Sequence, residues 1–364
     1  MTWIAIADHA QNLFCAQGLH AGKGAPDAST DDVNRFLPRG SIMLETYLSA
    51  QGRLQDLLGY HRAHPWKSGI TLQAVPGGGI VLVITQGNQV FHAALDHPVQ
   101  TRTDVVRITY SWDAPRKWGR LSVEFPGTTR LVSLILKSPK PLYLADIKEM
   151  TSTPGLRRMD DDVVFFAVSD RVEPIGPTPS LTATTPILTP SGYRPVGKLK
   201  RGDVVTSDDG NILPILQMVH RTVPARGTFE PVRLRHPYFE LQRDVIVGPL
   251  QRLVMGGSRV EYMFGTERVL VPARHVVNGT AAVYEKGHAV VTYSQILLPD
   301  HEAVIAAGTA VESLDIGRIR RKPNLLAESL LSGFERALLP DHSVTAYPVL
   351  RPFDAITLAE ERAA

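Results

Sequence analysis

Short apolar runs, interrupted again and again by glycine or proline, constrain the fold of this chain more than any other feature. Its 364 residues include 29 Gly and 27 Pro. The apolar runs between them are about four to eight residues long, which is the length of a β-strand. We therefore predict a mainly β protein. At about 150 residues per domain, the length predicts two domains.

The N-terminal half contains seven segments with β-branched enrichment or alternating apolar residues. They are Ser41–Leu48, Ile70–Val75, Ile80–Thr85, Gln89–Ala94, Asp104–Ser111, Gly119–Phe125 and Leu131–Lys137. Short strands separated by turn signals predict a β-sandwich over residues 41–172. Strands are expected to begin at Ser41, so residues 1–40 form a lead-in segment, with a loop at Gly24–Asp32. Gly77-Gly78-Gly79 is predicted to be a hairpin turn.

A linker is expected at residues 173–179, which read Glu173-Pro-Ile-Gly-Pro-Thr-Pro179. Three prolines and a glycine favour extended backbone there. Strand patterns then resume in a second β domain over residues 180–320. They are Pro186–Thr189, Asp203–Thr206, Leu213–Thr222, Phe229–Arg235, Val245–Val247, Arg252–Met255, Val260–Phe264, Ala281–Glu285 and His288–Leu297.

Residues 321–364 are predicted to form a C-terminal helix and tail. Asn324 is the expected N-cap of this helix. Apolar residues spaced by four then place Leu326, Leu330, Phe334 and Leu338 on one face. After Pro340 the chain is expected to be irregular or to form an edge strand.

Composition excludes several classes of protein. Lys+Arg 39 against Asp+Glu 36 gives a net charge of +3, which does not indicate a nucleic-acid partner. No apolar run approaches the roughly 18 to 20 residues of a membrane span, so a soluble protein is expected. The N-terminus lacks the basic region of a Sec signal peptide, so a cytoplasmic location and export by another route both stay open.

No cofactor or metal site is expected. Cys15 is the single cysteine, which excludes an intrachain disulfide and a multi-cysteine metal site. Asp160-Asp161-Asp162 lacks the spacing of a cation-binding loop and is interpreted as a solvated turn.

Several ordered motifs follow the linker. The first runs Ser180-Leu-Thr-Ala-Thr-Thr-Pro-Ile-Leu-Thr-Pro-Ser-Gly-Tyr-Arg-Pro-Val-Gly-Lys-Leu-Lys-Arg-Gly-Asp203, and later ones include Val271–Gly279, Asp300-His301-Glu302 and Leu350–Phe353. Together they resemble bacterial Hint domains, the Hedgehog/intein autoprocessing family, in the branch whose domain lies at the C-terminal end of the chain. The resemblance covers about residues 178 to 357 and implies a horseshoe-like β fold.

The family's chemistry, as this resemblance implies it, begins with a cysteine whose thiolate attacks the preceding carbonyl. Ser180 stands at that position. A serine hydroxyl is a much poorer nucleophile at neutral pH and needs an effective base. Some intein relatives nevertheless use serine to make an ester. The residue on the acyl side is Pro179, whose ring restricts how its carbonyl can be presented.

The family's second element is a Thr/Ser-x-x-His block, whose histidine protonates the leaving amide nitrogen. The matching stretch here is Gly248-Pro-Leu-Gln251-Arg252. Glutamine donates hydrogen bonds but does not shuttle protons, and acid–base help is typically worth about 10² to 10⁴ in rate. Gln295 stands where relatives often have a further histidine. His275 and His301 match the family pattern, either as groups that orient or protonate the site or as structural histidines.

The N-terminal half resembles laminin-G/concanavalin-like jelly rolls, several of which bind carbohydrate or protein. The likeness rests on Ile108–Val123 and on Ser41-Ile-Met-Leu-Glu-Thr. Trp112 and Trp118 are candidates to stack on a sugar ring, with a place in the sandwich core as the alternative.

The favoured function is therefore a Hint-domain protein without self-cleavage that acts as a binding or structural module. Its partner would be an unidentified protein or glycan. Edge strands in two β domains also leave oligomerisation open. The alternative is self-processing, in which Ser180 attacks the Pro179 carbonyl by a serine N–O acyl shift, helped by His275 or His301. An ordinary hydrolase or oxidoreductase finds no support, because the chain has no Gly-x-Ser-x-Gly, P-loop or dinucleotide motif.

Overall fold

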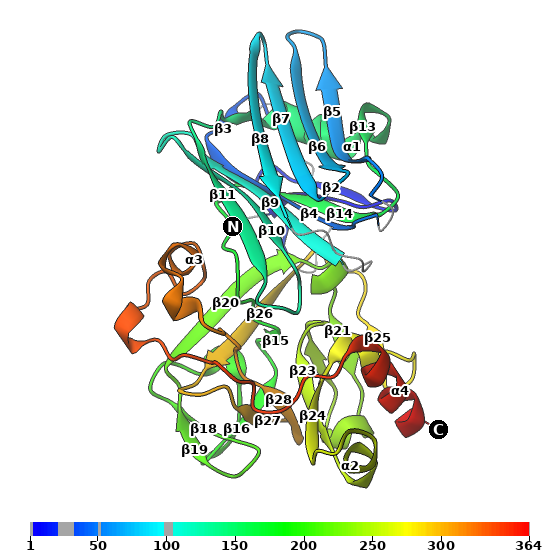
Figure 1. The fold of residues 1–364 in the computed structure, drawn as a ribbon, viewed down its shortest axis with the longest axis vertical. Helices are drawn as coiled ribbons and strands as arrows, with labels where there is room; N and C mark the ends of the chain where they lie inside the picture. The colour runs from blue at the N-terminus through cyan, green and yellow to red at the C-terminus, as the bar shows by residue number, and fades with distance from the viewer. Residues whose placement is uncertain (1–2, 21–32, 50–51, 98–104, 364) are drawn as a thin grey trace. The chain divides into compact units, whose positions relative to one another are not determined.

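The chain forms two compact units, Met1–Glu173 and Pro174–Ala364 (Figure 1). The computed structural model describes residues 3–20, 33–49, 52–97 and 105–363. Both units consist mainly of antiparallel β-sheet, as the sequence predicts.

The described residues of the N-terminal unit form two large sheets and one short ribbon. The seven-stranded sheet contains, in spatial order, β11 (Leu131–Lys137), β10 (Trp118–Glu124), β9 (Val105–Asp113), β4 (Arg39–Tyr47), β14 (Val163–Ser169), β1 (Trp3–Ala7) and β2 (Asn12–Phe14). The five-stranded sheet contains β13 (Arg157–Arg158), β5 (Gln55–Arg62), β6 (Ser68–Val75), β7 (Gly79–Gln86) and β8 (Gln89–Asp96). The ribbon pairs β12 (Leu142–Tyr143) with β3 (Phe36–Leu37).

Side chains of both large sheets form one apolar core, which defines this unit as a sandwich. Alternate residues of β7, namely Ile80, Leu82 and Ile84, enter it, as the period of a strand requires. Gly77 and Gly78 turn the β6–β7 hairpin with φ of 91° and 95°, a region open to glycine, so the predicted turn is confirmed. Helix α1 (Leu144–Ser152) buries Leu144, Ile147 and Met150.

The expectation that strands begin at Ser41 is wrong. β1 lies inside the large sheet between β14 and β2, and all five of its residues are buried. A strand buried on both faces shows a continuous apolar run instead of alternation, so the pattern sought in the sequence missed it. β2 and β3 also lie in the expected lead-in segment. The loop expected at Gly24–Asp32 lies outside the described residues.

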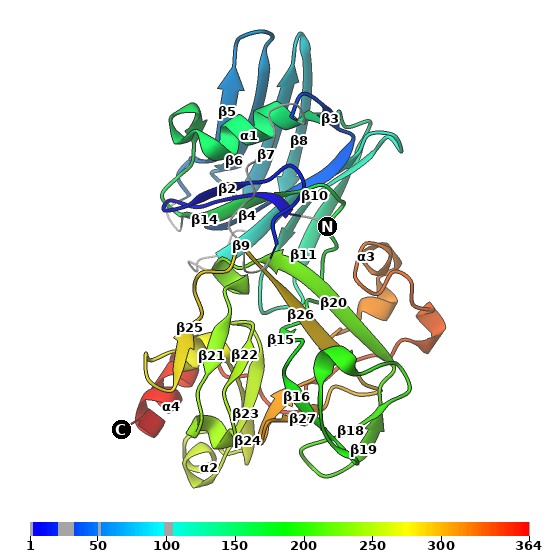
Figure 2. The ribbon, with the colours of Figure 1, turned by 180° about the vertical axis from the view of Figure 1, so that it is seen from behind.

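The C-terminal unit contains two six-stranded sheets and a two-stranded ribbon (Figure 2). The first sheet orders β20 (Gln217–Pro224), β26 (Val290–Leu297), β15 (Leu181–Thr182), β22 (Val245–Val247), β21 (Val232–Leu234) and β25 (Ala282–Tyr284). The second orders β17 (Gly192–Pro195), β16 (Pro186–Thr189), β27 (Ala303–Ala306), β28 (Thr309–Glu312), β23 (Arg252–Gly256) and β24 (Arg268–Pro272). The ribbon is β18 (Val204–Thr206) with β19 (Ile212–Pro214).

Short helices connect these strands. The α-helices are α2 (Ser258–Phe264), α3 (Pro323–Ala327) and α4 (Pro352–Ala363). The 3-10 turns are η2 (Pro154–Leu156) in the first unit and η3 (Val196–Lys198), η4 (Gly227–Phe229), η5 (Tyr238–Glu240), η6 (Ala273–Val276), η7 (Ile319–Arg321) and η8 (Arg336–Leu338) in the second. One core cluster joins both large sheets of this unit and includes Ala355 and Leu358 of α4.

Two predictions for this unit are wrong. Val260–Phe264 belongs to helix α2 instead of a strand, and Gly265 closes that helix in the left-handed conformation at φ 65°. The long helix expected after Asn324 ends at Ala327. The Ser329 hydroxyl donates to the carbonyl of Leu326 and accepts the N–H of Leu331, which replaces helical hydrogen bonding by a local turn.

Candidate functional site

Ser180 begins the second unit's sheet structure, directly before β15. The carbonyl of Ser180 accepts a hydrogen bond from the N–H of Gly248 at 2.6 Å. A Cβ at Gly248 would lie 3.2 Å from the Cβ of Ser180, so the absence of a side chain allows this close approach. The turn after β22 is thereby held against the first residue of the domain.

The Ser180 hydroxyl is paired with a side-chain amide. Its Oγ donates to Oε1 of Gln251 at 2.7 Å. Gln251 is fully buried at the end of that turn, where its N–H donates to the carbonyl of Gly248 and its carbonyl accepts the N–H of Ala273. The structure therefore brings together two of the residues that the sequence singled out, 71 positions apart.

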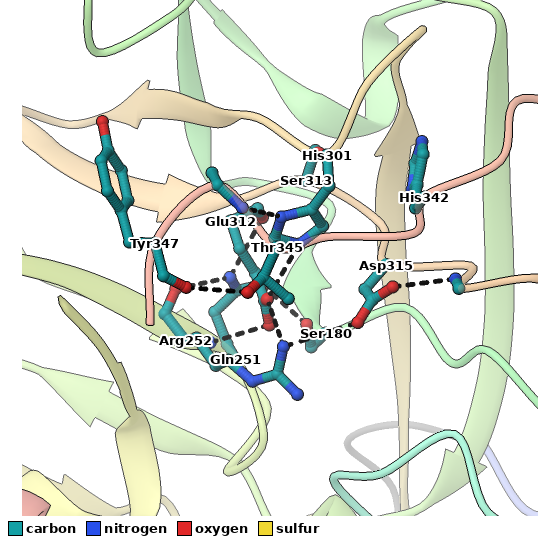
Figure 3. Close-up of polar contacts among 12 residues, drawn as sticks. Ser180, Gln251, Arg252, His301, Glu312, Ser313, Asp315, His342, Thr345 and Tyr347 are labelled. Atoms are coloured by element: carbon teal, nitrogen blue, oxygen red, sulfur yellow. Dashed lines mark hydrogen bonds and ion pairs between the residues drawn. The ribbon is translucent and has the colours of Figure 1, made fainter. Parts of the chain in front are cut away.

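Two carbonyl contacts fix the orientation of the Gln251 amide (Figure 3). Its Nε2 donates to the carbonyls of Arg252 at 3.0 Å and Glu312 at 3.2 Å. Gln295 Nε2 donates to Gln251 Oε1 at 3.2 Å and to the Glu312 carbonyl at 2.9 Å. Because the nitrogen faces carbonyl oxygens, Oε1 must face Ser180, and it can only accept hydrogen bonds.

An ion-pair cluster lies next to this amide pair. Arg252 Nη1 is 3.0 Å from Glu312 Oε2 and 3.6 Å from Asp315 Oδ2. The Arg252 side chain is 12% exposed and that of Glu312 10%, so water screens this pair little. Glu312 Oε1 also accepts the backbone N–H of Arg252. The carboxylate is thus occupied by arginine on both oxygens.

His301 lies on the far side of Glu312 from Ser180 (Figure 3). Its Nδ1 accepts the N–H of Ala346 at 3.0 Å, so in the neutral ring the proton is on Nε2, which faces Glu312 Oε2 at 3.3 Å. The His342 ring lies 6.0 Å away, between centroids. Burial lowers the pKa of His342. Among the described residues, the polar contacts of His301 do not include Ser180.

The backbone after His342 is tied to the domain by its own contacts. Tyr347 donates its hydroxyl to Asp208 at 2.6 Å and accepts from Arg268 at 2.8 Å. Burial, together with the Asp208 carboxylate, raises the pKa of Tyr347 to about 12. Val349 then forms a parallel bridge with Leu270. This segment therefore fixes the partner of His301 Nδ1 in place.

His275 lies in η6 and does not join the serine–glutamine pair through any polar contact within the described residues. Its Nε2 accepts a hydrogen bond from Arg274 Nε at 3.2 Å. Burial, and then the positive charge of Arg274, lower the pKa of His275 to about 4. The ring is therefore neutral at pH 7.

The two tryptophans considered for sugar stacking differ in exposure. Trp112 is fully buried in the sandwich core, and its Nε1 donates to the carbonyl of Leu37 at 2.9 Å. The suggestion that Trp112 stacks on a ligand is thus wrong, because both of its faces are covered. Trp118 is half-buried, and the Arg120 guanidinium carbon lies 5.8 Å from its ring.

Metal-binding geometry does not occur in the described ranges, where no group of three or more His, Cys, Asp or Glu side chains could hold an ion. Asp160 and Asp162, from the acidic triplet, instead bind Arg53 at 2.9 and 2.8 Å. No helix of the described chain is long and apolar enough to cross a membrane.

Arg252, Glu312 and Asp315 are site residues for which the sequence predicted no role. Arg252 occurs within the stretch Gly248–Arg252, which matches the family's second element. The available signal was a charged residue inside an apolar strand, as at Arg252 and Glu312. Charged residues are rarely buried unless they are paired, so each of these predicts an ion pair. Their partners could not be named from spacing alone.

A model of the Hint domain family matches residues 179–318. The chain is therefore a Hint-domain protein, as the sequence motifs predicted. The matched region lies within the C-terminal unit, and the β-sandwich of the N-terminal unit lies outside it. No curated protein sequence matches the chain.

Solved structures similar to this chain include two kinds of domain. The MchDnaB-1 intein (N145AA) is 13% identical, with 37% of this chain and 99% of that chain covered and a TM-score of 0.25. The Msm DnaB1 intein splicing domain bound with zinc is 18% identical, with 36% and 98% covered and a TM-score of 0.24.

The other kind is a carbohydrate-binding module. The Ruminococcus gnavus IT-sialidase CBM40 bound to α2,3-sialyllactose is 14% identical, with a TM-score of 0.24. The match covers 35% of this chain and 62% of the module's chain, so it spans less than two thirds of that protein.

Proposed function

We propose that this Hint-domain protein does not cleave its own backbone and acts intact as a binding or structural module. The observation that carries the proposal is the hydrogen bond from Ser180 Oγ to Gln251 Oε1 at 2.7 Å. In a self-cleaving site the hydroxyl would need a base at this position.

The amide oxygen of Gln251 cannot serve as that base, because a side-chain amide is not protonated near neutral pH. The Gln251 amide also cannot turn to offer another group, since its Nε2 is held by the carbonyls of Arg252 and Glu312. Ser180 therefore stays a neutral alcohol.

The second requirement is an acid that protonates the leaving nitrogen of Ser180. His301 uses Nδ1 to accept from Ala346 and Nε2 to face Glu312, so both ring nitrogens are occupied away from Ser180. His275 is neutral at pH 7, since its pKa is about 4, and its Nε2 accepts a hydrogen bond from Arg274 instead of facing Ser180. Neither histidine offers a proton to the bond between residues 179 and 180.

The position of Pro179 adds a steric argument. Pro179 is buried, and its ring restricts φ at the residue that carries the candidate carbonyl. A nucleophile must approach that carbonyl along a defined direction, so restricted backbone rotation at a buried residue opposes attack.

A rescue experiment tests whether two side chains account for the loss of cleavage. The double variant Ser180→Cys with Gln251→His restores a nucleophile and an acid at the two positions, and its mass is measured with and without hydroxylamine. We expect new fragments ending at Pro179 from this variant and an intact chain from the wild type. Ser180→Ala is the control and must stay intact in every condition.

Cleavage of the wild type at Pro179 would overturn the proposal in favour of self-processing through a serine N–O acyl shift. If wild type and Ser180→Ala both break at the same place, the cut comes from contaminating protease, and the proposal stands.

A further inference from the structure

Three aromatic residues form a cluster on the β3–β12 ribbon and the loop that enters β6. The ring planes of Phe36 and Trp66 are 12° apart, with centroids separated by 6.5 Å. Tyr143 contacts both at a steeper angle, with centroid distances of 5.4 Å to Phe36 and 5.6 Å to Trp66. Phe36, Trp66 and Tyr143 are called the aromatic cluster below.

The outer two rings of the aromatic cluster are open to solvent. Phe36 is 51% exposed and Trp66 is 46% exposed, whereas Trp112 of the same unit is fully buried. Tyr143 contacts both rings and is itself held in place: its hydroxyl donates to Asn34 at 3.0 Å, and the Arg62 guanidinium carbon lies 5.5 Å from its ring. Two parallel aromatic rings are thus fixed at the surface without being part of the core.

A hollow of about 350 Å³ lies where β7 ends and β8 begins, and it is lined by Ile84, Gln86, Gln89, Val90, Phe91 and Lys140. Gln86 connects the hollow to the aromatic cluster. It pairs with Ser68, two residues after Trp66, and its Nε2 donates to the carbonyl of Pro141, two residues before Tyr143. The volume is within the range of small-ligand sites, and the lining mixes apolar and hydrogen-bonding groups.

We propose that the aromatic cluster and this hollow form a saccharide-binding site. A pyranose ring has C–H faces that pack on aromatic rings and hydroxyls that need donors and acceptors nearby. Phe36 and Trp66 supply the first requirement, and Gln86, Gln89 and Lys140 supply the second. This proposal names the partner of the binding role proposed above and rests on that role, but not on the loss of self-cleavage.

A saccharide fits these observations better than a protein partner. The exposed rings are few, and they are flanked by the polar or charged residues His64 and Lys67, which are both exposed. A protein interface usually needs about 800 Å² on each side with a continuous apolar centre. The guanidinium of Arg62 is bound to Asp146 at 2.7 Å, so it is not offered to a separate anionic partner.

Binding of defined oligosaccharides to the full chain tests this site. The probes are cellohexaose, xylohexaose, mannohexaose, maltohexaose, chitohexaose and hexagalacturonic acid, each titrated by calorimetry and by tryptophan emission. We expect at least one probe to bind and to shift the emission of Trp66. Trp66→Ala and Phe36→Ala should each weaken that binding about tenfold or more.

Tyr262→Ala is the matched control, because Tyr262 is 86% exposed and belongs to the other unit. It should leave the affinity unchanged. Circular dichroism confirms that each variant is folded. Failure of every probe to bind, or unchanged binding in both Trp66→Ala and Phe36→Ala, would overturn the site. A chain that cleaves itself but still binds a probe contradicts only the proposed function, and an intact chain that binds none contradicts only this inference.

Discussion

The serine–glutamine pair of the C-terminal unit and the aromatic cluster of the N-terminal unit differ in how far their side chains are exposed to solvent. Gln251 and Gln295 are buried and bonded to neighbouring groups, and Glu312 is held by Arg252. Phe36 and Trp66 leave about half of their surface open. Polar groups that satisfy one another stabilise a fold, whereas exposed rings held in place are available to a ligand. The comparison supports the scaffold role that we propose for the first region and the binding role that we propose for the second.

Trp112 and Trp66, two of the four tryptophans of the N-terminal unit, should give the largest difference in stability when each is replaced. Trp112→Ala removes a fully buried ring and leaves the Leu37 carbonyl without its Nε1 donor, so it should lower the free energy of unfolding by about 3–5 kcal/mol. Trp66→Ala should change it by less than about 1 kcal/mol. Urea unfolding followed by circular dichroism measures both. Equal losses in the two variants would place Trp66 in the core and break the comparison.

The ion pair beside the serine–glutamine pair should give the next largest effect. Arg252→Ala removes the arginine partner of the buried Glu312 carboxylate, and loss of one partner of a buried pair costs about 3–5 kcal/mol, less whatever His301 and water recover. Arg259→Ala removes an exposed pair with Glu361 in the same unit, and because water screens that pair, its loss should lower the free energy of unfolding much less. Thermal unfolding of both variants measures the two losses of stability. A small loss for Arg252→Ala would show that the cluster is not structural.

The smallest effect should come from His275 and should depend on pH. Its pKa in the folded chain is about 4, below the ordinary value of 6.5, so the unfolded chain binds more protons between these values. The stability contributed by the neutral ring is present above pH 6.5 and is lost as the pH falls towards 4. His275→Gln should therefore flatten the decline in melting temperature across this window. Parallel curves for wild type and variant would mean that His275 does not contribute.

Much of the fold could be predicted from local patterns, but contacts between distant segments could not. β16 and β22 begin and end where the sequence placed them, because a short apolar run bounded by turn residues marks a strand. β14 was missed, since Val163–Ser169 is buried on both faces and does not alternate. Helix α4 was missed as well, although Pro352 at its first position and the spacing of Ala355 and Leu358 were visible signals.

For the candidate site as well, single positions could be predicted from the sequence, but the contacts between them could not. Family motifs identified positions 180 and 251, and the structure places them in hydrogen-bond contact. Glu312 was not predicted to hold Arg252, because that contact joins β28 to β23 across a sheet, which no local pattern encodes. The aromatic cluster was missed for a similar reason, since Phe36, Trp66 and Tyr143 are far apart in sequence.

The mass of the purified wild-type chain tests the absence of self-cleavage most directly. The chain is incubated at neutral pH with and without hydroxylamine and weighed by mass spectrometry. A single species at 39.9 kDa is expected in both conditions. An N-terminal fragment ending at residue 179, present in the wild type and missing from Ser180→Ala, would contradict the account.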